Sequence, residues 1–260
     1  MPELPEVEYA ARRLRRALRG RTIVHLRAHH PSQRRTLGAA VVRRVAGKMV
    51  RAVERRGKSQ LVLLSDGATL VVHFRMNGDW DFGRSGTALA AHARVSFDLD
   101  DGKRVSLVDS RALCTVRWYA PDAPPVFKLG PEPEDPALVP SALRAALQRK
   151  RGPIKPALLD QSVVAGVGNI YAAEACWHAR ISPRAPANKL SLPRVARLLD
   201  GLRSALADGH TNAARYHKGV REVPFNVYDR EGEPCNRCGR MIRRITQAGR
   251  STYFCAGCQR

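Results

Sequence analysis

Four cysteines near the C-terminal end have the spacing of a metal site. Cys235 and Cys238 form one C-x-x-C pair, and after sixteen intervening residues Cys255 and Cys258 form a second pair. Two such turns brought together complete a tetrahedral set of four thiolates that suits zinc. Free thiols or disulfides are the alternative, but the chain opens without an export signal, which favours metal. Because four protein ligands leave no open coordination position, we expect one structural zinc ion per chain and catalysis elsewhere.

The opening residues, MPELPEVE, carry a second set of groups that could do chemistry. A small residue after Met1 favours removal of the initiator methionine, which leaves Pro2 with a free secondary amine. An α-amino group has a reference pKa of about 8, so a sizeable fraction is nucleophilic near neutral pH. Such an amine suits attack on the anomeric carbon of a sugar, and Glu3 and Glu6 could move the protons. The same residues also fit an ordinary helix start.

The first part of the chain, residues 1–120, is expected to be a β-rich catalytic domain. Short runs with strand composition alternate with turn sequences such as Ser65-Asp66-Gly67 and Asp101-Gly102. This alternation predicts an antiparallel sandwich or barrel built from hairpins. Ahead of it, apolar residues at helical spacing predict a flanking helix over about 5–18, with arginines on its other face.

A segment dense in proline and acidic residues, 121–136, follows and predicts an interdomain linker. Residues 137–225 show helical periodicity, and Pro183 and Gly209 are expected to separate the helices. Residues 226–260 carry the four cysteines on a predicted β-hairpin. The expected fold class is therefore α+β and multidomain, which suits a chain of 260 residues.

The charge balance points to a polyanionic partner. The chain has 45 Lys and Arg against 23 Asp and Glu, a net charge of +22. Neutralised phosphates release counterions, so a surplus of this size favours nucleic acid, although a solvated surface or an Arg-rich coding bias is the alternative for any single basic run. The sequence contains no run of about 18 apolar residues, and it opens on MPELPEVE and not on a basic segment followed by an apolar one, so neither a membrane span nor a secretory signal is expected.

Several specific motifs are spread over the whole chain. They are MPELPEVE, the RRGKS turn around Lys58, HFRMNG, LGPEP, KPALLDQ, GVGNIYAAE and the terminal CNRC…GRSTYFCAGC. Together they resemble the bacterial formamidopyrimidine-DNA glycosylase family, whose relatives include the endonuclease VIII enzymes. With leucine at the second position of ELPEVE, the sequence resembles the formamidopyrimidine branch more than the endonuclease VIII branch, which typically has glycine at that position.

The resemblance implies a bifunctional DNA glycosylase and AP lyase of base excision repair. Such an enzyme excises oxidised or ring-opened bases through a Schiff base at its N-terminal proline and then cuts the strand by β,δ-elimination. The implied fold is an N-terminal antiparallel β-sandwich with a flanking helix and a C-terminal helix-two-turn-helix domain with a β-hairpin zinc finger. The implied partner is damaged double-stranded DNA, bound by a monomer in the bacterial cytoplasm and so associated with the nucleoid.

The resemblance also assigns catalytic roles. Pro2 corresponds to the Schiff-base nucleophile, and Glu3 to the acid that protonates the sugar and helps displace the base. Lys58 matches a lysine that assists the chemistry from the far side of the cleft, and Arg250 matches a finger arginine that grips phosphates and serves the second elimination. Without the resemblance, Lys58 and Arg250 would be ordinary surface cations.

Three further positions correspond to the residues that fill the gap left by an extruded nucleotide. Met76 and Arg111 match the family pattern, whereas Leu113 stands where an aromatic residue is common. A leucine can still wedge between bases, but it lacks aromatic stacking worth about 1–3 kcal/mol per base. This departure bears on the preference for the opposite base.

Five residues fall on positions that resemble the family's contacts to the DNA backbone, and they are expected to add affinity without sequence preference. They are His92, Arg94, Arg151, Lys155 and Asn169. Arg94 replaces the second histidine of a common family motif. Asn169 precedes an apolar helix, where it is also expected to cap the helix and to leave its N-terminus as a phosphate site.

A second departure lies between the last long helix and the finger, over residues 209–235. The family's oxidised-purine enzymes usually carry there a longer glycine-containing loop that closes over the extruded base. The shorter version here leaves two alternatives open: an endonuclease VIII-like glycosylase for oxidised pyrimidines, or a non-enzymatic paralogue that only binds damaged DNA. Retention of Pro2, Glu3, Lys58 and Arg250 argues against the second, because binding alone needs no free terminal amine.

Overall fold

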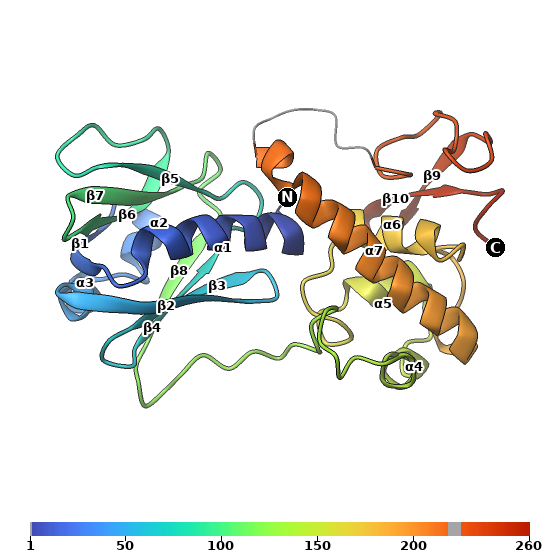
Figure 1. Ribbon diagram of the computed structural model, residues 1–260, viewed down its shortest axis with the longest axis horizontal. Coiled ribbons are helices and arrows are strands. Elements are labelled where there is room, and N and C mark those ends of the chain that lie inside the picture. The colour runs from blue at the N-terminus through green and yellow to red at the C-terminus, as the bar shows by residue number, and fades with distance from the viewer. Residues whose placement is uncertain (1, 218–224) are drawn as a thin grey trace. The chain divides into compact units, whose positions relative to one another are not determined.

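Residues 2–217 and 225–260 are described by a computed structural model, and they divide into two units (Figure 1). The first unit holds Pro2 and residues 7–127, and the second holds Glu3–Glu6 and residues 128–260. The chain therefore contributes its opening residues to both units. Among the described helices, none combines the length and the apolar character needed to cross a membrane.

The first unit is built on an antiparallel sheet of eight strands in the order β5-β7-β6-β1-β2-β3-β4-β8. The strands are β1 (Thr22–Ala28), β2 (Lys48–Arg56), β3 (Ser59–Leu64), β4 (Thr69–His73), β5 (Asp79–Arg84), β6 (Ala93–Leu99), β7 (Lys103–Val108) and β8 (Thr115–Tyr119). Strands β1 and β2 pair only at Thr22 with Met49 and Ile23 with Lys48, so the sheet splits into two four-stranded halves.

The two halves share one core with a helix. Ala10, Leu14 and Leu18 of α1 (Leu4–Leu18) are buried with Val62 of one half and Phe97 of the other. Two short helices, α2 (Pro31–Arg34) and α3 (Ala39–Val45), follow β1. The predicted β-sandwich with a flanking helix is confirmed.

The second unit is mostly helical and ends in a hairpin (Figure 1). Its elements are α4 (Pro140–Gln148), α5 (Ile154–Leu159), α6 (Asn169–His178), the 3-10 helix η1 (Ala187–Lys189), α7 (Leu192–His217), β9 (Ile242–Gln247) and β10 (Arg250–Cys255). Helix α6 is the centre of this unit, because every residue from Ile170 to Trp177 is buried. Strands β9 and β10 pair antiparallel from Ile242 with Cys255 to Gln247 with Arg250.

The predicted linker contains the boundary between the units, between Phe127 and Lys128. Its later part is fixed to the second unit: Gly130 donates to the carbonyl of Gln161 at 2.8 Å, and Pro131 accepts from Ala165 at 2.9 Å. A Cβ on Gly130 would lie 2.6 Å from the carbonyl oxygen of Ser162. The glycine of LGPEP therefore permits a close backbone contact, and residues 128–136 are an integral part of the helical unit.

The expectation that Gly209 separates two helices is wrong. Helix α7 runs through this residue without interruption. A Cβ on Gly209 would lie 2.5 Å from the ring and the hydroxyl of Tyr171 on α6. The glycine is therefore present because the two helices pack closely there, not because the helix ends.

Replacing Gly209 with alanine is expected to destabilise the protein. Alanine is normally favoured over glycine inside a helix by about 1 kcal/mol, but here its methyl group collides with the buried Tyr171 ring. We expect a net loss of about 1–3 kcal/mol in the free energy of unfolding, as for other overpacked sites. Denaturant unfolding checks this, with Thr211→Ala at an exposed position of α7 as control. A stabilised Gly209→Ala protein would contradict the packing explanation.

Candidate functional site

The carboxylate of Glu3 lies at the N-terminus of α6. Its Oε1 accepts the backbone N–H of Ile170 at 3.0 Å, and its Oε2 accepts that of Tyr171 at 3.4 Å. The Glu3 side chain is buried, and a Cβ on Gly168 would lie 2.1 Å from its Cδ. Only glycine at position 168 therefore leaves room for the carboxylate, which the first-turn amides and the helix dipole favour as an anion.

Glu6 and Tyr171 hold the backbone beside Glu3. One Glu6 oxygen accepts the N–H of Glu3 at 2.8 Å, and the other accepts the hydroxyl of Tyr171 at 2.7 Å. Gly166, with a φ of 81°, would bring a Cβ to 2.5 Å from Leu4 Cδ1. Both glycines of the GVG sequence thus make room for residues 3–6. Sequence reasoning missed Tyr171 and Gly168, although a Gly-x-Gly pattern before a buried helix is a usable signal for a close approach.

A second cluster joins Lys155, Asn169 and the start of β10. Lys155 is fully buried, and its Nζ donates to Asn169 Oδ1, to Thr252 Oγ1 at 2.9 Å and to the carbonyl of Ser251 at 3.2 Å. Asn169 Nδ2 donates to the same carbonyl at 3.0 Å. These two side chains thus fix the backbone next to Arg250, which is exposed at the first position of β10.

The predicted helix cap at Asn169 is wrong. The cap position is Gly168, without a side-chain cap, and Asn169 is the first helical residue. Its amide is directed to Ser251 and Lys155, because the close approach of Glu3 requires glycine at the cap.

Burial lowers the pKa of Lys155 to about 8, and the charge of Arg250 acts in the same direction. Arg151 is exposed between α4 and α5.

In the first unit, the three candidate gap-filling residues lie on exposed turns. Met76 follows β4 and is 37% exposed, and Leu113, on the loop between β7 and β8, is 43% exposed. Arg111 on the same loop is also exposed. Lys58 lies in the turn between β2 and β3, next to Gly57 with a φ of 56°.

The residue before Met76 has an unusual backbone conformation, since Arg75 has a φ of 58°. His73 Nδ1 accepts the N–H of Arg75 at 3.0 Å and so supports this turn. Burial lowers the pKa of His73 to about 4, with Arg75 and Lys58 adding to the effect. The ring is therefore neutral at physiological pH, as an acceptor nitrogen requires.

The two candidate backbone-contacting residues of the first unit differ in their surroundings. His92 is exposed ahead of β6 and has a φ of 60°. Arg94 is half-buried, and its guanidinium donates to the carbonyls of Asp109 at 2.7 Å and Ser110 at 3.3 Å. Arg94 thus contacts the loop that carries Arg111 and Leu113.

The four cysteines of the two C-x-x-C pairs come together in the second unit. Their Sγ atoms all lie within 4.8 Å of one another, with 3.4 Å between Cys238 and Cys255 and 3.9 Å between Cys235 and Cys258. A tetrahedral ion with bonds of about 2.3 Å places sulfurs about 3.8 Å apart, so the cluster fits zinc. The other two cysteines, Cys114 and Cys176, are buried, and burial raises the pKa of each thiol to about 12, as expected for core residues.

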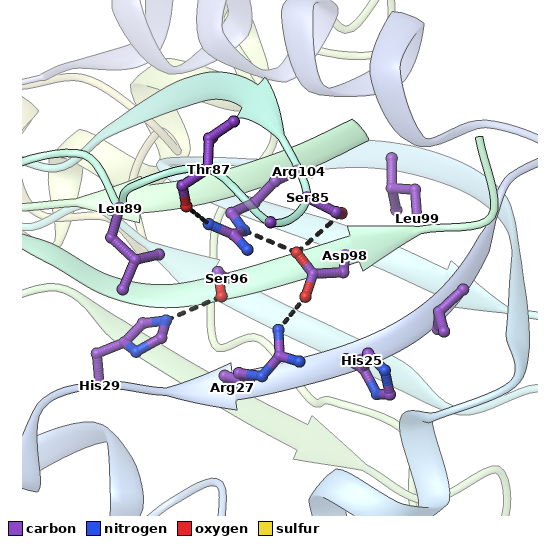
Figure 2. A pocket seen from close by; sticks show the side chains of 12 residues that line it. His25, Arg27, His29, Ser85, Thr87, Leu89, Ser96, Asp98, Leu99 and Arg104 are labelled. Atoms are coloured by element: carbon purple, nitrogen blue, oxygen red, sulfur yellow. Dashed lines mark hydrogen bonds and ion pairs between the residues drawn. The ribbon is translucent and has the colours of Figure 1, made fainter. Parts of the chain in front are cut away.

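A cavity of about 480 Å³ in the first unit holds none of the predicted site residues (Figure 2). Asp98 lines it and binds the guanidinium groups of both Arg27 and Arg104, while Ser85 donates to the same carboxylate at 3.1 Å. His29 is paired with Ser96 at 2.8 Å. Asp98 neutralises part of the positive charge of the two arginines, and Arg104 also donates to the Thr87 carbonyl and so holds the 85–87 turn. The role of this network is therefore to support the sheet.

Comparison with known proteins adds independent information. Residues 1–116 match the model of the formamidopyrimidine-DNA glycosylase N-terminal domain, residues 129–216 match its H2TH domain, and residues 232–260 match the zinc finger found in FPG and IleRS. The formamidopyrimidine-DNA glycosylase of Chloroflexus aurantiacus is 40% identical, over all of this chain and 98% of that protein. The chain belongs to the formamidopyrimidine-DNA glycosylase family. The enzyme of that name from Paracoccus denitrificans is 38% identical over the full length of both chains.

Solved structures of formamidopyrimidine-DNA glycosylases agree. The Lactococcus lactis enzyme, non-covalently bound to DNA with an AP site, aligns with a TM-score of 0.89 and 30% identity over 99% of both chains. MutM in complex with DNA containing carbocyclic 8-oxo-G aligns with a TM-score of 0.91 and 31% identity over the full length of both chains. The resemblance drawn from the sequence motifs is thereby confirmed.

The finger of this formamidopyrimidine-DNA glycosylase relative is attached to α6 through Trp177. The zinc-finger match and the cysteine cluster together show one structural zinc site. Trp177 Nε1 donates to Cys235 Sγ at 3.4 Å, and Arg237 stacks over the indole at 3.8 Å while donating to the Trp177 carbonyl at 2.9 Å. Helix α6 thus holds Glu3 at its first turn and the zinc finger at its last.

Replacing Trp177 with phenylalanine is expected to speed zinc loss. Cys235 then loses a hydrogen bond that stabilises its thiolate, worth about 1 kcal/mol, so release should be about fivefold faster. Release to a colorimetric chelator after a thiol reagent is added measures the rate. Trp118→Phe, in the other unit, is the control. Equal rates for both variants would show that the indole does not protect the site.

Proposed function

We propose that the chain is a DNA glycosylase and AP lyase of base excision repair, with the amine of Pro2 as nucleophile. The observation that carries the proposal is the carboxylate of Glu3, fixed by α6 amides directly after Pro2 in the chain. Membership of the formamidopyrimidine-DNA glycosylase family supports it.

The proposed reaction starts when the uncharged Pro2 nitrogen attacks C1′ of the damaged nucleotide. The glycosidic bond breaks and the base leaves with a proton. The C1′–O4′ bond of the sugar ring then opens, O4′ takes up a proton, and an iminium forms between Pro2 and C1′. Loss of a C2′ proton then breaks the C3′–O bond, and a second elimination breaks the C5′–O bond. Glu3 transfers the protons at the sugar, and its anchored position beside the nucleophile suits this role.

Other residues are proposed to bind and shape the DNA. Lys58 assists the chemistry, and Arg250 grips phosphates near the extruded nucleotide and serves the second elimination. Met76, Arg111 and Leu113 fill the gap in the duplex, which their exposure on turns supports. His92 and Arg151 are exposed cations or donors for phosphates.

Lys155 and Asn169 have a more specific proposed role than backbone contact. Both hold the Ser251 carbonyl, so they set the position of the preceding Arg250. The Lys155 ammonium is buried and donates to three protein acceptors, so it is better suited to holding this backbone than to binding a DNA phosphate.

The lesion class is proposed to be an oxidised or ring-opened purine, in line with the formamidopyrimidine of the relatives' name and the 8-oxo-G in the MutM complex. Leu113, in place of an aromatic residue, bears on the choice of the opposite base, and oxidised pyrimidines are the second candidate lesion class. The shortened loop bears on the same choice, but residues 218–224 lie outside the described part of the chain. Excision from duplexes with defined lesions opposite each base decides between the two classes.

Borohydride trapping tests the function directly. The wild-type protein, mixed with a duplex that carries an AP site and treated with borohydride, should form a covalent adduct on Pro2 that peptide mass spectrometry locates. Binding without an adduct would identify the non-enzymatic paralogue instead. We further propose that the protein acts as a monomer in the bacterial cytoplasm, which sedimentation with and without DNA would check.

A further inference from the structure

The loop that carries Arg111 and Leu113 is organised around one buried carboxylate. Asp109 is 1% exposed; its Oδ1 accepts the N–H of Arg111 at 3.0 Å, and its Oδ2 accepts those of Leu113 and Cys114 at 2.7 Å each. Hydrogen bonds to a charged acceptor are stronger than neutral ones. The side chains of Arg111 and Leu113 stay exposed while their backbone is held from inside.

Arg94 holds the same loop from β6. Its guanidinium donates to the carbonyls of Asp109 and Ser110, and the Asp109 N–H donates to the His92 carbonyl at 3.1 Å. These contacts use the planar fork that distinguishes arginine from lysine. The Arg94 side chain and one backbone hydrogen bond at His92 thus join the loop to β6 and to the residue before it.

The loop is also tied to the turn that carries Met76. Asn77 Nδ2 donates to Ser110 Oγ at 3.2 Å, so neighbouring residues of Met76 and Arg111 are in direct contact. The backbone is strained on both sides, because Arg75 and Ala112 have φ values of 58° and 54°. Residues other than glycine keep such conformations only where surrounding contacts enforce them.

We propose that Asp109 and Arg94 are positioning residues that preform the wedge of Met76, Arg111 and Leu113 before DNA arrives. The inference rests on the proposed function and deepens it. A wedge already in shape costs less ordering when the nucleotide is extruded. Arg94 acts through the carbonyls of the loop and not as one more phosphate contact.

The test compares two substrates that share the attack of Pro2 on C1′ but differ in the need for a wedge. In a single-stranded oligonucleotide with an AP site, there is no duplex base stack in which a gap must be filled. A nucleotide extruded from a duplex leaves such a gap, which the wedge fills. In Asp109→Asn an amide NH2 replaces one acceptor oxygen and faces backbone donors. We expect excision from the lesion duplex to fall about tenfold or more while trapping on the single strand is unchanged.

Arg94→Lys keeps the charge but loses the fork, so it should lower duplex excision in the same way and leave affinity for undamaged DNA unchanged. Ala112→Gly is the matched control, because glycine accepts the φ of 54° without strain and should change excision less than about twofold. A 2-aminopurine opposite the lesion reports insertion of the wedge directly, and its fluorescence change on binding should shrink in both test variants.

The outcomes separate the inference from the proposed function. A wild-type protein that cannot be trapped on the single strand refutes the function. A trappable wild type with Asp109→Asn and Arg94→Lys proteins that excise from duplexes at the wild-type rate overturns the inference. Equal losses on both substrates also overturn it, because the residues would then support the unit as a whole. If Asp109→Asn fails to fold by circular dichroism, Arg94→Lys decides.

Discussion

A variant that retains Met1, with one lysine inserted between Met1 and Pro2, is expected to cleave the DNA strand no faster than a control without enzyme. The Pro2 nitrogen is then a tertiary amide whose lone pair is delocalised into the carbonyl group, so it cannot attack a sugar. Affinity for AP-site DNA should persist, because the exposed residues of the gap-filling turns are unchanged. Gel-based cleavage, borohydride trapping and a binding titration on the same preparation measure the three quantities.

The control for this blocked protein is Pro2→Gly. Removal of Met1 leaves it a primary amine at the same place in the chain, so it should still be trapped, at a reduced rate. Intact mass establishes which N-terminus each preparation carries. Undiminished cleavage by a preparation in which Met1 is wholly retained would exclude the terminal amine as nucleophile.

The second large effect is expected for Glu3→Gln. The amide keeps the size of the side chain and one acceptor for the α6 amides but cannot take up or deliver the proton. General acid–base catalysis contributes about 10²- to 10⁴-fold, so base excision should fall by at least about 100-fold. Trapping on a preformed AP site should fall less, because the base has already departed. Single-turnover excision and trapping on matched duplexes give the two rates.

Gly168→Ala offers an independent check on the same carboxylate. Its methyl group would occupy the place of the Glu3 side chain, where the Cβ comes within 2.1 Å of Cδ. We therefore expect it to reproduce the loss seen with Glu3→Gln although no titratable group is changed. If Glu3→Gln excises at the wild-type rate, Glu3 transfers no proton and its burial at α6 is purely structural.

Sequence reasoning was strongest where the chemistry is local in the chain. The spacing of two C-x-x-C pairs is enough to predict a tetrahedral metal site. Turn sequences between segments of strand composition are enough to predict an antiparallel fold. The sandwich, the hairpin and the zinc site follow from such local rules and are confirmed. The functional roles of Met76, Arg111 and Leu113 came from resemblance, since one exposed turn residue resembles any other.

The errors concern residues whose environment is set by distant parts of the chain. Gly209 was expected to end a helix because its partner, the Tyr171 ring, lies on another helix. Asn169 has the right type for a cap, but Glu3 occupies the space that a capping residue other than glycine would need. The DNA contact expected of Arg94 stays a prediction, and the fold adds that its guanidinium donates to two loop carbonyls, which the sequence alone does not show.

The membership of Glu3–Glu6 in the helical unit has a consequence for how this protein can be divided. A fragment that begins at Lys128 lacks Leu4, which is part of the hydrophobic core of the helical unit. It also leaves the amides at the start of α6 without their carboxylate. The two halves are therefore not interchangeable cassettes: a chimera that takes its helical half from a relative must also take that relative's opening residues.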